Sequence, residues 1–330
     1  MMLSPPVVCY LLAALSVVFV LHFHLLAAVF AGLAVHVLTV KLAARLPKHW
    51  SGGAHAAALG AIVLGVILGL FGVGFGLWFS LRGHHGMAGL LTVVAETLEK
   101  LKRTLPAGMS SVLPDTVNDL KEQITTLLQE HGREISTAGM AGFKTFAHVL
   151  LGMIIGGMTV LHRFTGVDSW PPFAFELYAR SKSLAEAFDK VVFAQVKISA
   201  LNTVLTVFYL VIVLPVFGIH LPMVKILVPF TFVAGLIPVL GNLISNTLVV
   251  LVSLSVSLGV AGASLVFLIL IHKLEYFTNA RIIGAEVDAR AWELLCAMLA
   301  MEAVFGVAGL VSAPVVYAWL KAELKAKQMI

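Results

Sequence analysis

Long apolar runs, separated by shorter polar segments, dominate the pattern along this chain of 330 residues. The first run covers residues 7–40 and is interrupted only by His22, His24 and His36. A single helix of that length would measure about 50 Å, whereas the hydrocarbon core of a bilayer is about 30 Å thick. We therefore predict two short transmembrane helices that meet around His22–His24.

Three further apolar runs have the length of a membrane crossing: residues 56–81, 146–161 and 198–216. The glycines of the first of these follow small-xxx-small spacing, which lets helices approach closely. Residues 83–144 are polar and carry apolar positions at helical intervals, so we expect a small helical insert outside the bilayer. Residues 172–196 follow a proline pair and predict an amphipathic helix at the membrane interface.

Residues 225–271 form an apolar run without an internal charge, about twice as long as one span needs. The middle of this run carries Pro238, Gly241 and Asn242. Pro238 removes a backbone donor, while Gly241 and Asn242 tolerate a left-handed turn. Backbone groups freed by such a break cannot face lipid, so the break must be buried in protein or line a cavity. The pattern therefore predicts a broken-helix hairpin.

A polar loop (residues 272–293) and a last apolar helix (294–320) are expected to close the chain. The chain then has about eight transmembrane helices and an all-α, polytopic fold. It divides into N-terminal transmembrane helices (1–82), the helical insert (83–144) and a transmembrane core (145–330). Basic residues gather in short loops and in the C-terminal tail, so the positive-inside rule places both termini in the cytoplasm and the insert on the opposite side.

Composition supports the membrane class. Hydrophobic residues make up 60% of the chain and charged residues 12%, and the mean hydropathy is +1.00. Soluble domains carry about 25% charged residues. The net charge of +5 lies mostly in short loops and tails, which favours membrane orientation over nucleic-acid binding. Cys9 and Cys296 both lie in apolar segments, so no disulfide framework is expected.

Motifs of enzymes and metal sites are missing from the sequence. It contains no HExxH, no phosphate-binding P-loop and no GxSxG, and its 12 histidines are scattered without Cys, Asp or Glu at ligand spacing. No nucleophile, base and orienting group occur together. We therefore predict neither an enzyme nor a metal or cofactor site.

Polar residues at membrane depth carry the remaining chemistry. Asn242, Ser245 and Asn246 cluster at the predicted hairpin tip. Glu302 lies inside the last apolar helix, where an ionised carboxylate costs several kcal/mol unless it is paired, protonated or wet. Two interpretations of Glu302 stay open: a functional group in a transport path, or a structural partner for a nearby asparagine or serine.

Three segments resemble motifs of the autoinducer-2 exporter family of bacterial permeases. The segment Gly235-Leu-Ile-Pro-Val-Leu-Gly241 is similar to the hairpin tip of that family. Glu275 to Gly284, which ends Ala-Arg281-Ile-Ile-Gly, is similar to its polar loop, and Phe305 to Pro314 is similar to the signature of its final helix. The segments occur in the family's order. The chain departs from the family at Asn242, where a second proline is usual, and at Glu302, where a small or apolar residue is common.

The resemblance implies an exporter of a small polar solute, such as a quorum-sensing signal, in the inner (plasma) membrane. It also implies a homo-oligomer, because homologues assemble as pentamers. From the motifs and the polar residues together, we expect the transport path to contain Pro238, Gly241, Asn242, Ser245, Asn246, Glu275, Arg281, Glu302 and Gly306.

Two other functions stay open. The first is exchange of sodium ions and protons with Glu302 as the titrating group, since the family includes members proposed as antiporters. The second is a non-transporting membrane scaffold whose helical insert binds partners. A pairing of Glu302 with Asn242 or Asn246 discriminates between these classes. In a wet cavity such a pair favours transport, whereas a dry, fully bonded cluster favours a scaffold.

Overall fold

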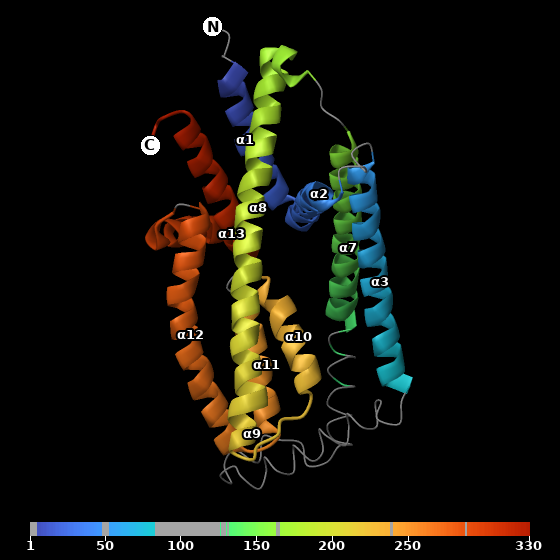
Figure 1. The fold of residues 1–330 in the computed structure, drawn as a ribbon, viewed down its shortest axis with the longest axis vertical. Helices are drawn as coiled ribbons and strands as arrows, with labels where there is room; N and C mark the ends of the chain where they lie inside the picture. The colour runs from blue at the N-terminus through green and yellow to red at the C-terminus, as the bar shows by residue number, and fades with distance from the viewer. Residues whose placement is uncertain are drawn as a thin grey trace. The chain divides into compact units, whose positions relative to one another are not determined.

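The computed structural model describes residues 5–47, 53–82, 126, 130, 132–162, 166–237, 240–287 and 289–330. Every regular element within these residues is helical (Figure 1). In chain order, the elements are α1 (Pro5–His22), α2 (Leu26–Arg45), α3 (Ala54–Arg82), α7 (Gly132–Leu161), η2 (Val167–Ser169), α8 (Pro172–Val207), η3 (Phe208–Val213), α9 (Leu214–Val216), α10 (Val224–Gly235), α11 (Leu240–Leu254), α12 (Leu258–Val287) and α13 (Ala291–Ala326). Most of the predicted insert (83–144) lies outside the described residues, and its last part forms the start of α7.

The helices form two compact units. The first holds the described residues of 1–68, 140–194 and 283–330, and the second holds those of 69–139 and 195–282. The first unit therefore groups the first and the last helices of the chain. This division cuts across the three predicted segments, which follow composition rather than contacts.

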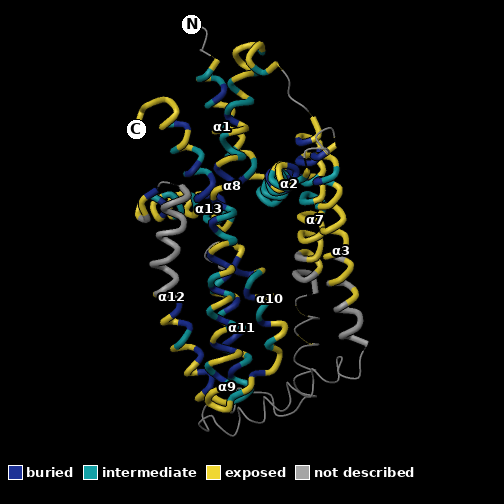
Figure 2. Tube along the Cα trace, viewed as in Figure 1, coloured by how far each residue is buried: buried dark blue, intermediate teal, exposed yellow. Residues whose placement is uncertain are grey.

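The helices have the length and surface of a membrane protein. Within the described residues, five helices are long and apolar enough to cross a bilayer, and four shorter apolar helices accompany them. Large apolar side chains such as Leu15, Phe71 and Ile155 are at least 60% exposed, and exposed positions run along most of the helices in Figure 2. Contact of such apolar surfaces with lipid is favourable, whereas their exposure to water is not. The chain is an all-α polytopic membrane protein, as its sequence predicts.

The predicted junction of the first two helices is present. α1 ends at His22, and His24 adopts a left-handed φ of 57°. The Leu25 N–H then bonds the Val20 carbonyl oxygen at 2.8 Å and closes the end of α1. Histidine is among the residues that tolerate the left-handed region, so this turn forms without a glycine or proline.

The predicted amphipathic helix (172–196) and the predicted span (198–216) are not two separate helices but form one continuous helical run. Beyond its first residue, α8 contains no proline or glycine that would end it. The first irregularity is the π-helical turn η3, which precedes Pro215. Pro215 has no N–H to donate, and the Leu214 N–H bonds the Tyr209 carbonyl five residues earlier.

The apolar run 225–271 breaks twice, not once. The first break lies between α10 and α11 and confirms the predicted hairpin tip. The second lies at 255–257, where the Ser257 hydroxyl accepts a hydrogen bond from the Val260 N–H at 3.1 Å and caps α12. α10 has 12 residues and α11 has 15, whereas a full crossing needs about 20. α10 and α11 are therefore short helices that pack against each other.

α12 extends through most of the predicted polar loop (272–293), so the loop prediction is wrong. The helix continues for 30 residues and ends at Val287. The predicted loop was inferred from polarity alone. Polar composition does not oppose a helix, because Lys, Glu, Arg and Ala all have favourable helix propensity, and no proline interrupts the segment.

α13 folds back on itself at Gly306, whose φ of 61° and ψ of −144° are open essentially to glycine alone. Glu293 Oε2 accepts hydrogen bonds from Tyr317 Oη at 2.5 Å and from Lys321 Nζ at 2.7 Å. In a continuous helix, Glu293 and Lys321 would be about 42 Å apart at 1.5 Å per residue. The two halves therefore lie side by side, which corrects the predicted single span over 294–320.

Glycines bring α2 and α7 into backbone contact. A Cβ added at Gly152 would overlap the Ala28 carbonyl, and one added at Gly156 would overlap the Gly32 carbonyl. The spacing of the α3 glycines predicts close packing there as well. A Cβ added at Gly60, Gly65, Gly69 or Gly72, however, has no atom of the described chain within 4 Å. Close packing through the α3 glycines is therefore not found among the described residues.

A buried ion cluster holds α1, α8 and α13 together. Arg180 and Glu323 are 7% and 6% exposed, and Arg180 Nε lies 3.0 Å from Glu323 Oε2. Tyr10 Oη donates to the same oxygen at 3.0 Å, and Glu176 lies 2.5 Å from Arg180 Nη2. Because each charge has an opposite charge within contact, the cluster offsets the cost of removing these groups from water.

Candidate functional site: a polar seam at a broken helix pair

A row of polar side chains follows one face of the second part of α8. Gln195, Ser199, Asn202 and Thr206 are separated by four, three and four positions, the spacing that places side chains on one side of a helix. Ser199, Asn202 and Thr206 are each at most 2% exposed. The row lies in the second unit. Polar groups buried this deeply need partners.

The carbonyl groups at the end of α10 are partners of this row. Gln195 Nε2 donates to the Gly235 carbonyl oxygen at 2.7 Å, and the Ser199 hydroxyl donates to the Phe232 carbonyl oxygen at 2.5 Å. The last carbonyls of a helix have no partner within the helix. α8 therefore supplies the hydrogen bonds that the break between α10 and α11 leaves open.

The first turn of α11 meets the same row. Asn202 Nδ2 donates to Asn242 Oδ1 at 2.8 Å. Ser245 is 1% exposed, and its hydroxyl donates to the Asn242 carbonyl at 3.3 Å. Gly241 is buried where α11 passes α10, and an added Cβ would overlap the Ala234 carbonyl. We call Gln195, Ser199, Asn202 and Asn242 the polar seam.

A second set of buried hydroxyls lies in the same unit. Tyr209 Oη and Ser264 Oγ are 2.9 Å apart, and Ser264 Oγ and Ser253 Oγ are 2.7 Å apart. Because Ser253 donates to the Val249 carbonyl at 2.8 Å, it accepts from Ser264, which in turn accepts from Tyr209. This hydroxyl chain ties η3 to α11 and α12 and ends at a backbone carbonyl. It therefore acts as a structural tie.

The structure brings together part of the predicted path. Gly241, Asn242 and Ser245 lie at the polar seam, and Asn246 is half-buried one residue beyond. Pro238 lies outside the described residues, as do the side chains of Glu275 and Arg281. The place of these three residues in the transport path stays a prediction.

Glu302 and Gly306 belong to the other unit. Gly306 makes the fold of α13, and Glu302 lies on the half before it with an exposed side chain. No hydrogen bond or ion pair joins Glu302 to the part of the chain that the structure describes. The pairing of Glu302 with Asn242 or Asn246 stays a prediction, while Asn242 has Asn202 as a partner.

The polar row of α8 was missed in the sequence. Gln195 and Ser199 fell near the expected boundary between two helices, so their shared face with Asn202 and Thr206 was not apparent. The signal was nevertheless present, because these residues recur every three or four positions in an increasingly apolar helix. Among the described residues, no group of three metal-ligating side chains occurs.

Protein-family models, curated proteins and solved structures were compared with this chain, and none of them matches. The helices define the class of the protein: an all-α polytopic membrane protein with a broken helix pair. Polar side chains of a third helix form hydrogen bonds with the free backbone groups at the break.

Proposed function

We propose that this protein is a membrane transporter for a small polar solute, with the polar seam as part of the transport path. One observation carries the proposal. α10 and α11 break inside an apolar run, and α8 places Gln195, Ser199 and Asn202 against the break. In secondary transporters, discontinuous helices of this kind form solute and ion sites near the middle of the membrane.

The ends of the two short helices suit a polar ligand. The end of α10 presents carbonyl oxygens, and the start of α11 presents N–H groups and the positive end of its dipole. The amides of Asn202 and Asn242 can each donate and accept. A solute with hydroxyl or carbonyl groups can replace the bond between these two amides, while the Gly235 and Phe232 carbonyl oxygens keep their bonds to Gln195 and Ser199. The site therefore fits an uncharged polar solute better than a bare cation.

The resemblance to autoinducer-2 exporters supplies the first solute to test and the expected setting. We propose export of a quorum-sensing signal from the cell, a location in the inner membrane with both termini in the cytoplasm, and a homo-oligomer. The cofactor-free, non-enzymatic function predicted from the sequence is part of the same proposal.

Exchange of sodium ions and protons is the second candidate. The observation that favours it is Glu302, an exposed carboxylate on an apolar half-helix that ends at Gly306. A carboxylate in such a segment is costly unless water, a proton or a cation reaches it. Under this candidate, Glu302→Gln abolishes pH-dependent flux while assembly stays normal, whereas flux that is unchanged across pH would reduce Glu302 to a packing residue.

The test is flux into proteoliposomes that contain the purified protein, with autoinducer-2 and sodium ions as separate probes. Asn202→Leu keeps the size of the side chain and removes both the hydrogen-bond donor and the acceptor of the Asn202 amide. We expect autoinducer-2 flux to fall about tenfold, since a lost hydrogen bond in a buried site costs about 1–3 kcal/mol. Thr203→Val is the matched control, because the Thr203 hydroxyl donates to the Ser199 carbonyl of its own helix and does not contact the broken helix pair in the described residues. Correctly assembled protein that moves neither probe contradicts transport of both and favours a scaffold.

A further inference from the structure

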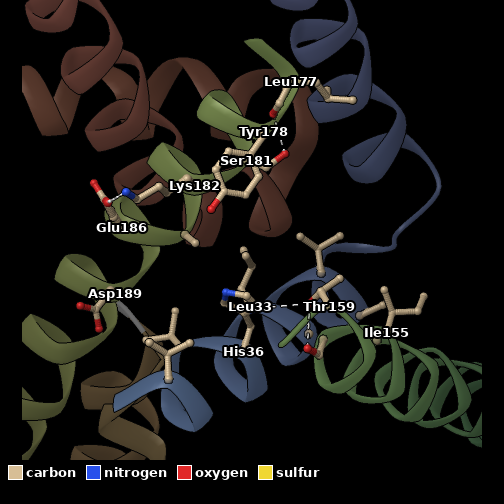
Figure 3. Close-up of a pocket in the computed structure, with 18 of the residues that line it drawn as sticks. Leu33, His36, Ile155, Thr159, Leu177, Tyr178, Ser181, Lys182, Glu186 and Asp189 are labelled. Carbon is tan, nitrogen blue, oxygen red and sulfur yellow. Dashed lines mark hydrogen bonds and ion pairs between the residues drawn. The ribbon is translucent and has the colours of Figure 1, made fainter. Parts of the chain in front are cut away.

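A cavity of about 1010 Å³ lies within the first unit, between α2, α7 and the first part of α8. Figure 3 shows the labelled side chains of all three helices around this space. Its volume is at the upper end of the range of about 300–1,000 Å³ for ligand pockets. The residues of the polar seam do not line it, so it is independent of the proposed transport path.

Most of the cavity wall is apolar. Val29, Leu33 and Val37 line it from α2, and Leu151 and Ile155 line it from α7. The backbone contact at the α2–α7 glycines forms part of the same wall. Within the wall, His36 Nδ1 and Thr159 Oγ1 lie 3.1 Å apart, and Thr159 donates to the Gly156 carbonyl at 2.8 Å. The apolar wall therefore suits a hydrocarbon chain.

Charged groups gather along the α8 side of the cavity, as Figure 3 shows for Lys182, Glu186 and Asp189. Lys41 Nζ lies 2.7 Å from Asp189 Oδ1, and Lys182 Nζ lies 4.0 Å from Glu186 Oε1. The lining thus carries two cations and two anions and has no net charge at this edge. The second pair is mostly exposed, so both of its charges can meet a headgroup.

Two aromatic residues place this edge relative to a membrane. Trp170 and Tyr178 line the cavity, and their rings meet edge to face at a centroid distance of 5.7 Å. Trp and Tyr are enriched at the level of lipid headgroups. With the aromatic and charged edge at that level, the apolar wall leads toward the hydrocarbon core.

From these four features we infer that the cavity binds one membrane phospholipid with a zwitterionic headgroup. An acyl chain lies along the apolar wall, and the headgroup meets Ser181, Lys182 and Glu186. The balanced charge of the edge favours a headgroup that carries both signs over an anionic one. Both headgroups offer a phosphate to Lys182, but only the zwitterionic headgroup also offers an ammonium group to Glu186.

Native mass spectrometry of the delipidated full-length protein tests this inference. The probes are phosphatidylethanolamine and phosphatidylglycerol with identical acyl chains. We expect a one-to-one complex with phosphatidylethanolamine at about tenfold lower lipid concentration than with phosphatidylglycerol, a difference of about 1.4 kcal/mol. Glu186→Gln leaves one net positive charge at the edge and is expected to reverse or abolish this preference.

A filled cavity provides the second arm. Ala174→Trp adds an indole to the lining, and we expect it to weaken phosphatidylethanolamine binding about tenfold or more. Ala200→Trp is the matched control, because Ala200 lies on the same helix, is exposed and does not line the cavity. The inference is overturned if Ala174→Trp, Ala200→Trp and the unchanged protein bind phosphatidylethanolamine equally. It is also overturned if the unchanged protein binds the two lipids equally.

A third arm does not depend on folding of a variant. A phosphatidylethanolamine with a photoreactive diazirine on its acyl chain is bound to the unchanged protein and cross-linked by light. Cross-links in peptides that contain Leu33, Leu151 or Ile155 support the site, and cross-links only elsewhere overturn it. Autoinducer-2 flux reports on the polar seam alone, so failure of either proposal is seen separately.

Discussion

Gly306 gives the sharpest test of the fold of α13. Replacing Gly306 by Ala adds a Cβ that meets no described atom within 4 Å, so sterics with neighbours contribute nothing. The cost arises from the backbone alone, because a φ of 61° with a ψ of −144° is almost closed to residues with a side chain. Strained conformations of this kind cost about 1–3 kcal/mol. We expect Gly306→Ala to lower the free energy of unfolding by that amount.

Two other glycines separate the possible causes. Gly309→Ala places a Cβ on the Met301 carbonyl across the fold, so it destabilises by overlap and not by φ. Gly262→Ala lies in α12 with open space around it, and it is expected to be neutral or to stabilise by up to about 1 kcal/mol through helix propensity. Thermal or denaturant unfolding in one detergent compares all three.

A distance measurement tests the fold directly. Cys296 is exposed on the first half of α13, and Leu320 is exposed on the second. Spin labels at Cys296 and at Leu320→Cys, with buried Cys9 replaced by Ser, would be about 36 Å apart in a continuous helix. The folded arrangement predicts a much shorter distance, which lengthens in Gly306→Ala. A single distance near 36 Å in the unchanged backbone, with no loss of stability in Gly306→Ala, refutes the reasoning.

Three other changes have expected outcomes in the same unfolding assay. Arg180→Met leaves the carboxylate of Glu323 buried without its cation and should cost about 3–5 kcal/mol, whereas the same change at exposed Lys182 should have little effect. Gly152→Ala forces α2 away from α7 and should cost about 1–3 kcal/mol. Ser264→Ala strands the buried Tyr209 hydroxyl and should cost about 1–3 kcal/mol, whereas adding Tyr209→Phe should recover part of that loss; additive costs would show that the two hydroxyls are not coupled.

Much of the helical framework was predictable because its signals are local. The turn between α1 and α2 follows from the length of one apolar run. Pro238, Gly241 and Asn242 predict the break between α10 and α11, although Gly241 and Asn242 lie in the first turn of α11 and neither has a positive φ. The turn is predicted because the apolar run is longer than the bilayer is thick, and the break is predicted because Pro238 removes a backbone donor. Neither requires knowledge of which helices pack together.

The wrong predictions have other causes. The continuous α8 and the helical end of α12 depend on how polarity is interpreted, whereas the fold of α13 depends on the backbone conformation of Gly306. The polar residues at 172–196 and 272–293 predict an interfacial helix and a loop, although neither segment has a proline beyond Pro172. A single glycine in an apolar helix is common, so the sequence around Gly306 does not by itself predict that the helix folds back there.

The partners of the polar seam could not be read from local sequence for the same reason. Gln195 and Gly235 are 40 positions apart, and so are Asn202 and Asn242. Ser199 and its partner Phe232 are 33 positions apart, so every bond of the seam joins residues that are distant in the sequence. A polar row spaced for one helix face and a helix break 40 residues later are each weak signals, but together they predict that the row bonds the broken ends.

The bonding at the seam also bears on how a solute could pass. The bonds from Gln195 and Ser199 go to backbone carbonyls, which stay in place as long as α10 is folded. The bond between Asn202 and Asn242 joins two side chains, each of which can rotate. A neutral hydrogen bond contributes only about 1 kcal/mol net when a replacement partner is present. In the proposed path, the amide pair is therefore the element that a polar solute can open, while the carbonyl bonds keep the broken helix in position.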